Sequence, residues 1–307
     1  EALVDASTSD DAAVYALGDG YALVVTLDFV TPLVDDPHDF GRIAVTNALS
    51  DIYAMGAKPL FALNLLGFPR SLLGNGMVEE IIRGGSDMAR EAGIPIMGGH
   101  SVDDPEPKYG LVVVGKAPVE EIVSNVSAEV GEALVLTKPL GTGIVATAIK
   151  AGAAPEHVVA TAVASMTTLN REAAEVMKRI GVRAATDVTG YGVLGHLGNL
   201  LHQSGVAAEI TADALPVLPG VPELIRTGHI SAGAKRNLKD LATQVDFGET
   251  VETSRLILAD PQTSGGLLMS VPAERVSQLM ELLRDDAPNA TTIGHVTEGT
   301  TGTIRVR

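Results

Sequence analysis

The stretch Asp39–Met55, DFGRIAVTNALSDIYAM, predicts one long helix that ends at Gly56. Asn47 and Asp51 are four residues apart and share a face, with Ser50 beside them. A surface helix usually carries a broad charged face, whereas a thin polar stripe among apolar residues favours a face turned toward a ligand or an ion. The alternative is that these residues face solvent between core contacts.

Strands and helices alternate on both sides of this helix. Before Pro118 we expect strands over Tyr21–Asp28, Lys58–Leu66, Ile94–Met97 and Tyr109–Lys116, with a helix over Met77–Ala92. After Gly131 we expect strands over Ala133–Thr137, Arg183–Asp187 and Val206–Thr211, helices over Gly143–Ala151, His157–Ile180 and Tyr191–Ser204, and a strand–helix–strand unit over Gly265–Arg307. The segment between Pro118 and Gly131 loses the apolar runs. We therefore predict two domains, residues 1–125 and 126–307.

The composition narrows the class of protein. A chain of 307 residues with 46% hydrophobic residues can bury two ordinary cores. A formal net charge of −16 without a basic stripe argues against nucleic acid as a partner. Cysteine is absent, which excludes a disulfide scaffold or a thiol nucleophile within these residues. No apolar run reaches the length of a membrane span, so we expect no membrane partner and a cytoplasmic protein.

Several aspartates stand beside or within apolar runs. Asp10 and Asp11 precede a short apolar strand, Asp28 ends an apolar run, Asp51 lies in the helix, and Asp187 closes a later strand. An unpaired carboxylate is costly to desolvate, so these placements predict a shared cation. Mg²⁺ is the expected ion because it takes a few carboxylates together with substrate phosphates. The alternative is that the aspartate pair sits at an ordinary loop end and that Asp187 caps a helix.

Two glycine-containing segments suit turns near an anion, and a third forms a tight polar turn. Gly98-Gly99-His100-Ser101, directly after a predicted strand, resembles a phosphate-contacting turn, and Thr137–Gly143 precedes a helix whose N-terminus favours an anion. Both segments equally fit simple tight turns, because neither matches the P-loop pattern. For the third, Asp260–Gly266, a tight polar turn ahead of an apolar strand, we favour a structural or site-bracing role over direct chemistry. The histidines show no His-x-x-x-His pair, and only His100 is expected to contact a ligand.

Taken together, these segments resemble the selenophosphate synthetases, or selenide, water dikinases. The resemblance rests on Asp10–Tyr15, Thr26–Phe29, Asp39–Gly56, Gly98–Ser101 with Asp104–Pro107, Thr186–Gly192 and Asp260–Gly266, in order along nearly the whole chain. The aspartate pair and the Ser-Asp helix are shared with thiamine monophosphate kinase and aminoimidazole ribonucleotide synthetase of the same superfamily. The His-Ser loop with its Asp-Pro-Glu-Pro extension and the Asp-Pro-Gln-Thr-Ser-Gly-Gly turn are more specific.

The resemblance implies a two-domain α+β fold of the aminoimidazole ribonucleotide synthetase type. Its N-terminal mixed sheet would form a barrel across a homodimer, and its C-terminal half would be an α/β sandwich, with ATP in a cleft between the halves. The family converts ATP, selenide and water to selenophosphate, AMP and phosphate. It requires Mg²⁺, with K⁺ as a usual activator, and a selenium-delivery protein is a further possible partner.

The resemblance also implies site residues at the matching motif positions. The Mg²⁺ ligands would be Asp11, Asp51 and Asp187. The ATP site would be lined by Thr8, Ser9, Asp10, Asp28, Asn47, Asp51, Gly99, His100 and Ser101.

The family also carries a mobile glycine-rich loop upstream of the Asp-Asp segment. That loop holds a cysteine or selenocysteine and an essential lysine. The resemblance therefore implies that the catalytic residues lie upstream of Glu1, that none lies within the chain, and that the chain as given is impaired in turnover. A non-catalytic nucleotide-binding paralogue and another kinase or synthetase of the superfamily remain alternatives.

Overall fold

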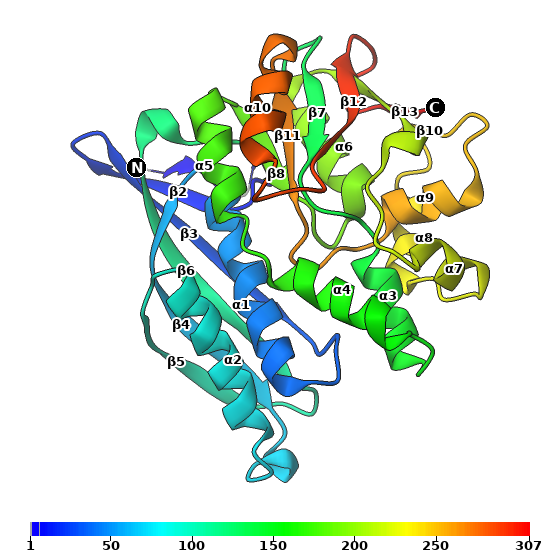
Figure 1. Cartoon of the computed structure of the whole chain (residues 1–307). Helices are drawn as coiled ribbons and strands as arrows, with labels where there is room; N and C mark the ends of the chain where they lie inside the picture. Colours follow the sequence, from blue (N-terminus) through cyan, green and yellow to red (C-terminus); the bar gives the residue numbers. More distant parts are fainter. Residues whose placement is uncertain (1, 6) are drawn as a thin grey trace.

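The computed structural model describes residues 2–5 and 7–307, which form two mixed β-sheets with helices packed on them (Figure 1). The first sheet belongs to the N-terminal part of the chain, coloured blue to cyan-green, and the second to the C-terminal part. Helix α1 lies between the two sheets and contacts elements of both. The predicted α+β class with a mixed N-terminal sheet is confirmed.

The first sheet has six strands. In spatial order they are β1 (Ala2–Val4), β2 (Ala13–Gly18), β3 (Tyr21–Val30), β6 (Lys108–Pro118), β4 (Lys58–Phe68) and β5 (Ile96–Asp103). Neighbouring strands are antiparallel except β4 and β5, which are parallel. Strand β5 therefore forms one edge of the sheet, three strands away from β3.

Two helices, α1 (Pro37–Ala54) and α2 (Met77–Glu91), pack closely on one face of this sheet. Helix α1 begins where the Asp36 carboxylate accepts a hydrogen bond from the Asp39 N–H, and Pro37 occupies its first turn. Gly41 and Gly84 lie where the two helices meet. A Cβ on Gly41 would stand 2.0 Å from the Ile81 carbonyl oxygen, so only glycine permits this approach. The predicted helix over Asp39–Met55 is confirmed.

The second sheet has seven strands. In spatial order they are β10 (Val245–Asp246), β13 (Ile304–Val306), β9 (Ala207–Ile210), β12 (Thr291–Thr297), β7 (Ala133–Leu136), β11 (Leu267–Val271) and β8 (Ala184–Asp187). Every residue of β11 is buried, as expected for a strand whose two faces are both covered. Helices α5 (Arg171–Ile180) and α10 (Val276–Leu283) pack together, and α6 (Gly192–Ser204) packs with α8 (Ala232–Asp240) and α9 (Glu252–Ala259). The remaining helices are α3 (Thr142–Lys150), α4 (Glu156–Thr167) and α7 (Val221–Arg226).

Two sequence predictions were wrong. The single helix expected over His157–Ile180 is two helices, α4 and α5, separated at Thr168–Asn170, because Asn170 turns inward to bind Ser50 and the Gly265 carbonyl. The turn expected at Gly98–Ser101 belongs to strand β5, which pairs with β4. Helices α8 and α9 were not anticipated.

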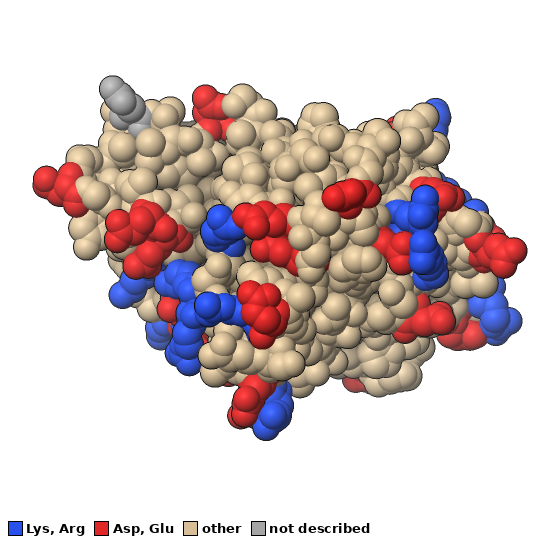
Figure 2. All heavy atoms as spheres, turned by 90° about the horizontal axis from the view of Figure 1, so that it is seen from above, with Lys and Arg blue, Asp and Glu red and all other residues tan. Residues whose placement is uncertain are grey.

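No helix in the described part of the chain is long and apolar enough to cross a membrane. The face drawn in Figure 2 mixes acidic and basic side chains in small groups, with broad uncharged areas between them. The basic groups on this face are interrupted by acidic ones rather than forming a continuous stripe.

Candidate active site

The polar stripe of α1 is buried at the junction between the two parts of the fold. Asn47 is 3% exposed and Ser50 is 1% exposed, although both are polar. On this side α1 contacts β8, α4 and α5 of the C-terminal part. The stripe therefore faces another part of the protein rather than solvent, which excludes the solvent-facing alternative.

Asp11, Asp51 and Asp187 come together at this junction. Asp51 is supplied by α1, Asp187 by the end of β8, and Asp11 by the segment just before β2. Burial, followed by repulsion between these carboxylates, raises the pKa of Asp11 and of Asp51 well above the usual range. Burial also raises the pKa of Asp187 to about 6. Three mutually repelling carboxylates, Asp187 buried and Asp11 and Asp51 half-buried, call for a cation.

The hydrogen bonds of these carboxylates leave oxygens free. Thr186 Oγ1 donates to Asp11 Oδ1 at 2.8 Å, and Thr26 Oγ1 donates to Asp51 Oδ2 at 2.5 Å. Asp11 Oδ2 and Asp187 Oδ2 are buried and have no hydrogen-bond partner among the described residues. Buried polar atoms of this kind are uncommon and are often explained by an ion or water. An all-oxygen set of carboxylates is the donor set that Mg²⁺ prefers, so these residues fit that ion.

Asp28 and Asn47 form a second layer beside the cluster. Thr26 and Asp28 are two residues apart in β3 and point to the same face of the sheet, toward α1. Asn47 Nδ2 donates to Asp28 Oδ2, while Asn47 Oδ1 accepts a 2.7 Å hydrogen bond from the Ser264 N–H. Burial raises the pKa of Asp28. Asn47 thus joins β3 to a loop of the C-terminal part.

Thr186 and His196 were not identified from the sequence. His196 is half-buried, and desolvation of its ring lowers the pKa of the imidazole to about 4, so the ring is neutral at pH 7. Its Nε2 accepts from the Thr189 N–H at 3.1 Å, which leaves the proton on Nδ1, 3.4 Å from Thr186 Oγ1. His196 therefore orients the hydroxyl that holds Asp11. The only sequence signal was Thr186 standing directly before Asp187.

The segment holding Thr8, Ser9 and Asp10 is anchored by two asparagines. Asn125 donates its backbone N–H to Asp10 Oδ1 at 3.2 Å and its amide to the Ser9 carbonyl at 3.1 Å. Asn199 of α6 also donates to the Ser9 carbonyl, at 3.0 Å. Burial raises the pKa of Asp10 to about 6. These bonds fix the chain just ahead of Asp11.

The turn Asp260–Gly266 braces the start of α3. The Asp260 carboxylate accepts from the Ile144 N–H at 3.1 Å and from Ser231 Oγ at 2.8 Å. Gln262 Oε1 accepts from the backbone N–H groups of Gly141 and Thr142. These contacts support the bracing role favoured from the sequence, and burial raises the pKa of Asp260 to about 7.

Gly99, His100 and Ser101 are not brought to the carboxylates. They lie in the exposed edge strand β5. Asp28, Leu111, Asn64 and Gly99 form one row across β3, β6, β4 and β5. Because neighbouring strands are about 4.8 Å apart, Gly99 stands roughly 14 Å from Asp28 within one chain.

A cleft of about 770 Å³ lies between α1 and the α4–α5 region. Arg42, Arg171 and Glu172 are among its lining residues, whereas none of the predicted site residues lines it. A second acidic group, Asp36 with His38 and Asp39, lies near the start of α1. Each of its members already has a protein partner, namely a backbone N–H, Asp87 or Arg42. We therefore place the candidate site at the buried carboxylates.

Comparison with known protein families and solved structures identifies the fold class of this chain. The AIR synthase related protein N-terminal domain matches residues 9–117, and the corresponding C-terminal domain matches residues 129–307. Among solved structures, a thiamine-monophosphate kinase from Stenotrophomonas maltophilia has a TM-score of 0.71 at 22% identity, covering 99% of this chain and 90% of that one. The hydrogenase maturation protein HypE in complex with ATP has a TM-score of 0.69 at 20% identity, covering 97% of this chain and 85% of that one. The chain has the AIR synthase related fold.

Curated relatives define the family within this class. The selenide, water dikinase of Carboxydothermus hydrogenoformans is 50% identical over 100% of this chain and 89% of its own length. That of Myxococcus xanthus is 48% identical over 98% of this chain and 86% of its own length. The chain belongs to the selenide, water dikinase family, a family of phosphotransferases, as its sequence motifs predict.

Proposed function

We propose that this protein converts ATP, selenide and water to selenophosphate, AMP and phosphate. The observation that carries this proposal is the group of Asp11, Asp51 and Asp187, in which two buried carboxylate oxygens have no partner among the described residues. The names of its relatives, at up to 50% identity over the whole chain, support selenide as the acceptor. The likeness to an ATP-bound fold supports ATP as the donor.

The residues of the chain act mainly by positioning. When bound by Asp11, Asp51 and Asp187, Mg²⁺ neutralises the charge of the transferring phosphoryl groups. Asp28 and Asn47 hold β3, α1 and the Ser264 loop in one arrangement beside this group. Thr8, Ser9 and Asp10, anchored by Asn125 and Asn199, form the adjoining wall of the proposed nucleotide site. A hydroselenide nucleophile requires little activation, so alignment and charge neutralisation are the main requirements.

Selenide-dependent AMP formation tests this proposal. Protein expressed from its complete gene is incubated without oxygen with ATP, Mg²⁺ and selenide, and AMP and selenophosphate are followed by chromatography and phosphorus NMR. We expect formation of both products, and no product with excess EDTA. Calorimetric titration should likewise show nucleotide binding only with the divalent cation, because bare phosphates would face three carboxylates. Equal nucleotide affinity with and without EDTA would contradict the metal site, and binding without AMP formation would favour a non-catalytic paralogue.

We further propose that the chain forms a homodimer through the open face of the first sheet. Side chains on this face alternate with the buried ones of the same strands. Large apolar members are exposed, including Tyr15 at 56%, Leu27 at 57% and Phe29 at 49%. An apolar face of this kind in a folded chain marks an interaction surface. A second copy of the same sheet is its proposed occupant, which is the predicted barrel arrangement.

The dimer also gives a role to Gly99, His100 and Ser101. These residues lie at the edge of the same sheet, too far from Asp28 to share one nucleotide with it easily inside one chain. We propose that they contact the nucleotide held by the partner's carboxylates.

Leu27→Glu tests the interface and this role together. Two buried like charges should dissociate the dimer to the 31.7 kDa single chain in analytical ultracentrifugation and weaken Mg-nucleotide binding about tenfold or more. Lys235→Glu, on the distant helix α8, is the matched control and should change neither quantity. A Leu27→Glu chain that remains dimeric would contradict the interface; a dissociated one with unchanged affinity would contradict the role across the dimer.

A further inference from the structure

Ser264 combines two unfavourable features in the loop between α9 and β11. Its backbone has a φ of 49°, a left-handed conformation that serine rarely adopts. Its side chain is also buried, with the residue 1% exposed, and Oγ has no hydrogen-bond partner among the described residues. Both features cost free energy in the ligand-free protein.

The backbone of Ser264 is held from two sides. Its N–H donates to Asn47 Oδ1 of α1 at 2.7 Å, and its carbonyl accepts from Lys138 Nζ at 2.9 Å. Lys138 also donates to the Thr168 carbonyl, at 2.6 Å, at the end of α4. The ammonium group is fully enclosed and lies close enough to Asp187 for the two charges to interact. Ser264 is therefore fixed between the two parts of the fold, beside the carboxylates.

A purely structural loop would not need this serine. Glycine would remove the backbone strain, and alanine would remove the unpaired hydroxyl. The next two residues, Gly265 and Gly266, are glycines that the backbone packing requires, since a Cβ on Gly265 would stand 2.0 Å from the Val188 carbonyl oxygen. At Ser264 the chain keeps a hydroxyl where neither packing nor the backbone calls for one. Strain and an unpaired donor held this firmly are typical of a ligand-contacting position.

We propose that the Ser264 hydroxyl donates a hydrogen bond to a phosphate oxygen of the metal-bound nucleotide, and that Lys138 is the positioning residue that holds the loop. Asn47 connects the Ser264 N–H to the Asp28 carboxylate, so Ser264 is two hydrogen bonds away from the proposed phosphate site. A further donor suits this place, because the nearby carboxylates repel an oxyanion while the Lys138 ammonium already donates to the Thr168 and Ser264 carbonyls. The inference rests on the proposed nucleotide site and adds a contact to it.

Two substitutions at one position separate ligand contact from stability. Ser264→Ala and Ser264→Gly both remove the hydroxyl, and we expect each to weaken the affinity for Mg-ADP in calorimetric titration by about tenfold or more. Thermal unfolding without ligand should show unchanged or raised stability for both, because Ala removes the unpaired hydroxyl and Gly the strain. Ser270→Ala is the control. Its hydroxyl donates to Glu132 Oε2 at 2.6 Å within the second sheet, so we expect lower thermal stability and an affinity within twofold of wild type.

Lys138→Met tests the positioning role. Methionine keeps the length of the side chain without a charge, so the fold should survive. We expect weaker Mg-ADP binding together with faster amide exchange at Gly265 and Gly266, whereas Ser264→Ala should leave this exchange unchanged. Unchanged exchange in Lys138→Met would overturn the role of Lys138.

The outcomes distinguish this inference from the proposed function. If wild type binds Mg-ADP and both Ser264 variants bind it within twofold of wild type, the hydroxyl contact is wrong and the nucleotide site stands. If wild type binds no Mg-ADP at all, the proposed nucleotide site itself fails, and this inference fails with it.

Discussion

Asp51→Asn is expected to weaken Mg-dependent nucleotide binding by about 100-fold or more while leaving the fold intact. The substitution keeps the shape of the side chain and its acceptor for Thr26 Oγ1, but it removes one of three carboxylate charges. In the metal-free protein the same change relieves repulsion from Asp187 and Asp11 and removes the cost of burying a charge. We therefore expect the melting temperature without metal to rise.

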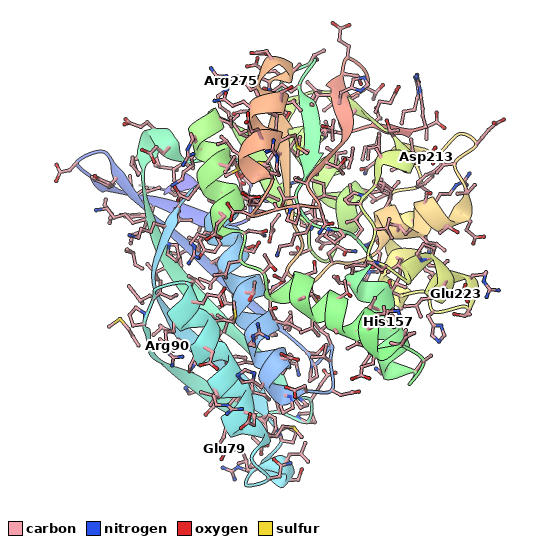
Figure 3. The ribbon with its side chains drawn as sticks, in the orientation of Figure 1. Glu79, Arg90, His157, Asp213, Glu223 and Arg275 are labelled. Carbon is pink, nitrogen blue, oxygen red and sulfur yellow. The ribbon has the colours of Figure 1, made fainter. Side chains whose placement is uncertain are left out.

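The control for this variant is an identical chemical change at the surface. Asp213 is exposed and lies at the outer edge of the C-terminal part, labelled in Figure 3 far from α1. Asp213→Asn should alter neither the nucleotide affinity nor the melting temperature noticeably. Isothermal calorimetry and differential scanning calorimetry on the three proteins give both quantities. Wild-type affinity in Asp51→Asn would show that Asp51 has only a structural role.

The second large effect is expected in the pH dependence of stability without metal. Burial raises the pKa of Asp187 to about 6, from 3.8, and moves the pKa values of Asp11 and Asp51 in the same direction. Between the pKa of an aspartate in the unfolded chain and its raised pKa in the folded state, the folded state binds more protons than the unfolded state. The free energy of unfolding therefore falls as pH rises through this range. For a single carboxylate shifted this far, the loss is roughly 3 kcal/mol across the window.

Two other groups, His196 and Lys138, make the folded state more stable as pH rises, and they limit the pH range in which the carboxylates dominate. His196, with its pKa lowered to about 4, contributes a gain in stability as pH rises toward 6.5. Lys138, with its pKa lowered to about 7, contributes a gain only above that pH. Several carboxylates outweigh the single histidine. We therefore expect a net loss of stability from pH 5 to pH 7.

Urea unfolding at pH 5, 6 and 7 measures this loss. Saturating Mg²⁺ should reduce it, because deprotonated carboxylates bind the ion and binding to the folded state adds stability. In EDTA, Asp51→Asn should make the free energy of unfolding depend less steeply on pH. A free energy of unfolding that rises between pH 5 and pH 7 in EDTA would contradict the buried, mutually repelling carboxylates.

The sequence predicted the elements whose signal is local. The α1 pattern of apolar residues with one thin polar stripe located the helix to within two residues at each end, with Gly56 as the stop signal. Pro37, at which the helix begins, was not used. Asp187 at the end of β8 was placed correctly because the strand is short, apolar and followed by glycines. The apolar surroundings singled out a set of aspartates, whereas the choice of Asp11, Asp51 and Asp187 among them came from the family resemblance.

The failures concern interactions between distant segments. Gly98 and Gly99 resembled a turn, yet they belong to β5, where a Cβ on Gly99 would stand 2.2 Å from the Asn64 carbonyl oxygen of β4. The break between α4 and α5 follows from Asn170 reaching α1, which no local pattern shows. Lys138 and His196 become notable only once the fold has brought them near the carboxylates, with Lys138 buried and His196 half-buried.

The three carboxylates are contributed by both parts of the chain: Asp11 and Asp51 come from the first, and Asp187 from the second. Neither part alone supplies all three carboxylates of the proposed nucleotide site, so neither part could be moved into another protein with that site complete. An exchange of C-terminal parts between relatives would keep the three carboxylates together only if β8 and α1 packed against each other in the same relative position. The contact between α1 and β8 is therefore as necessary to the proposed site as the packing within either part.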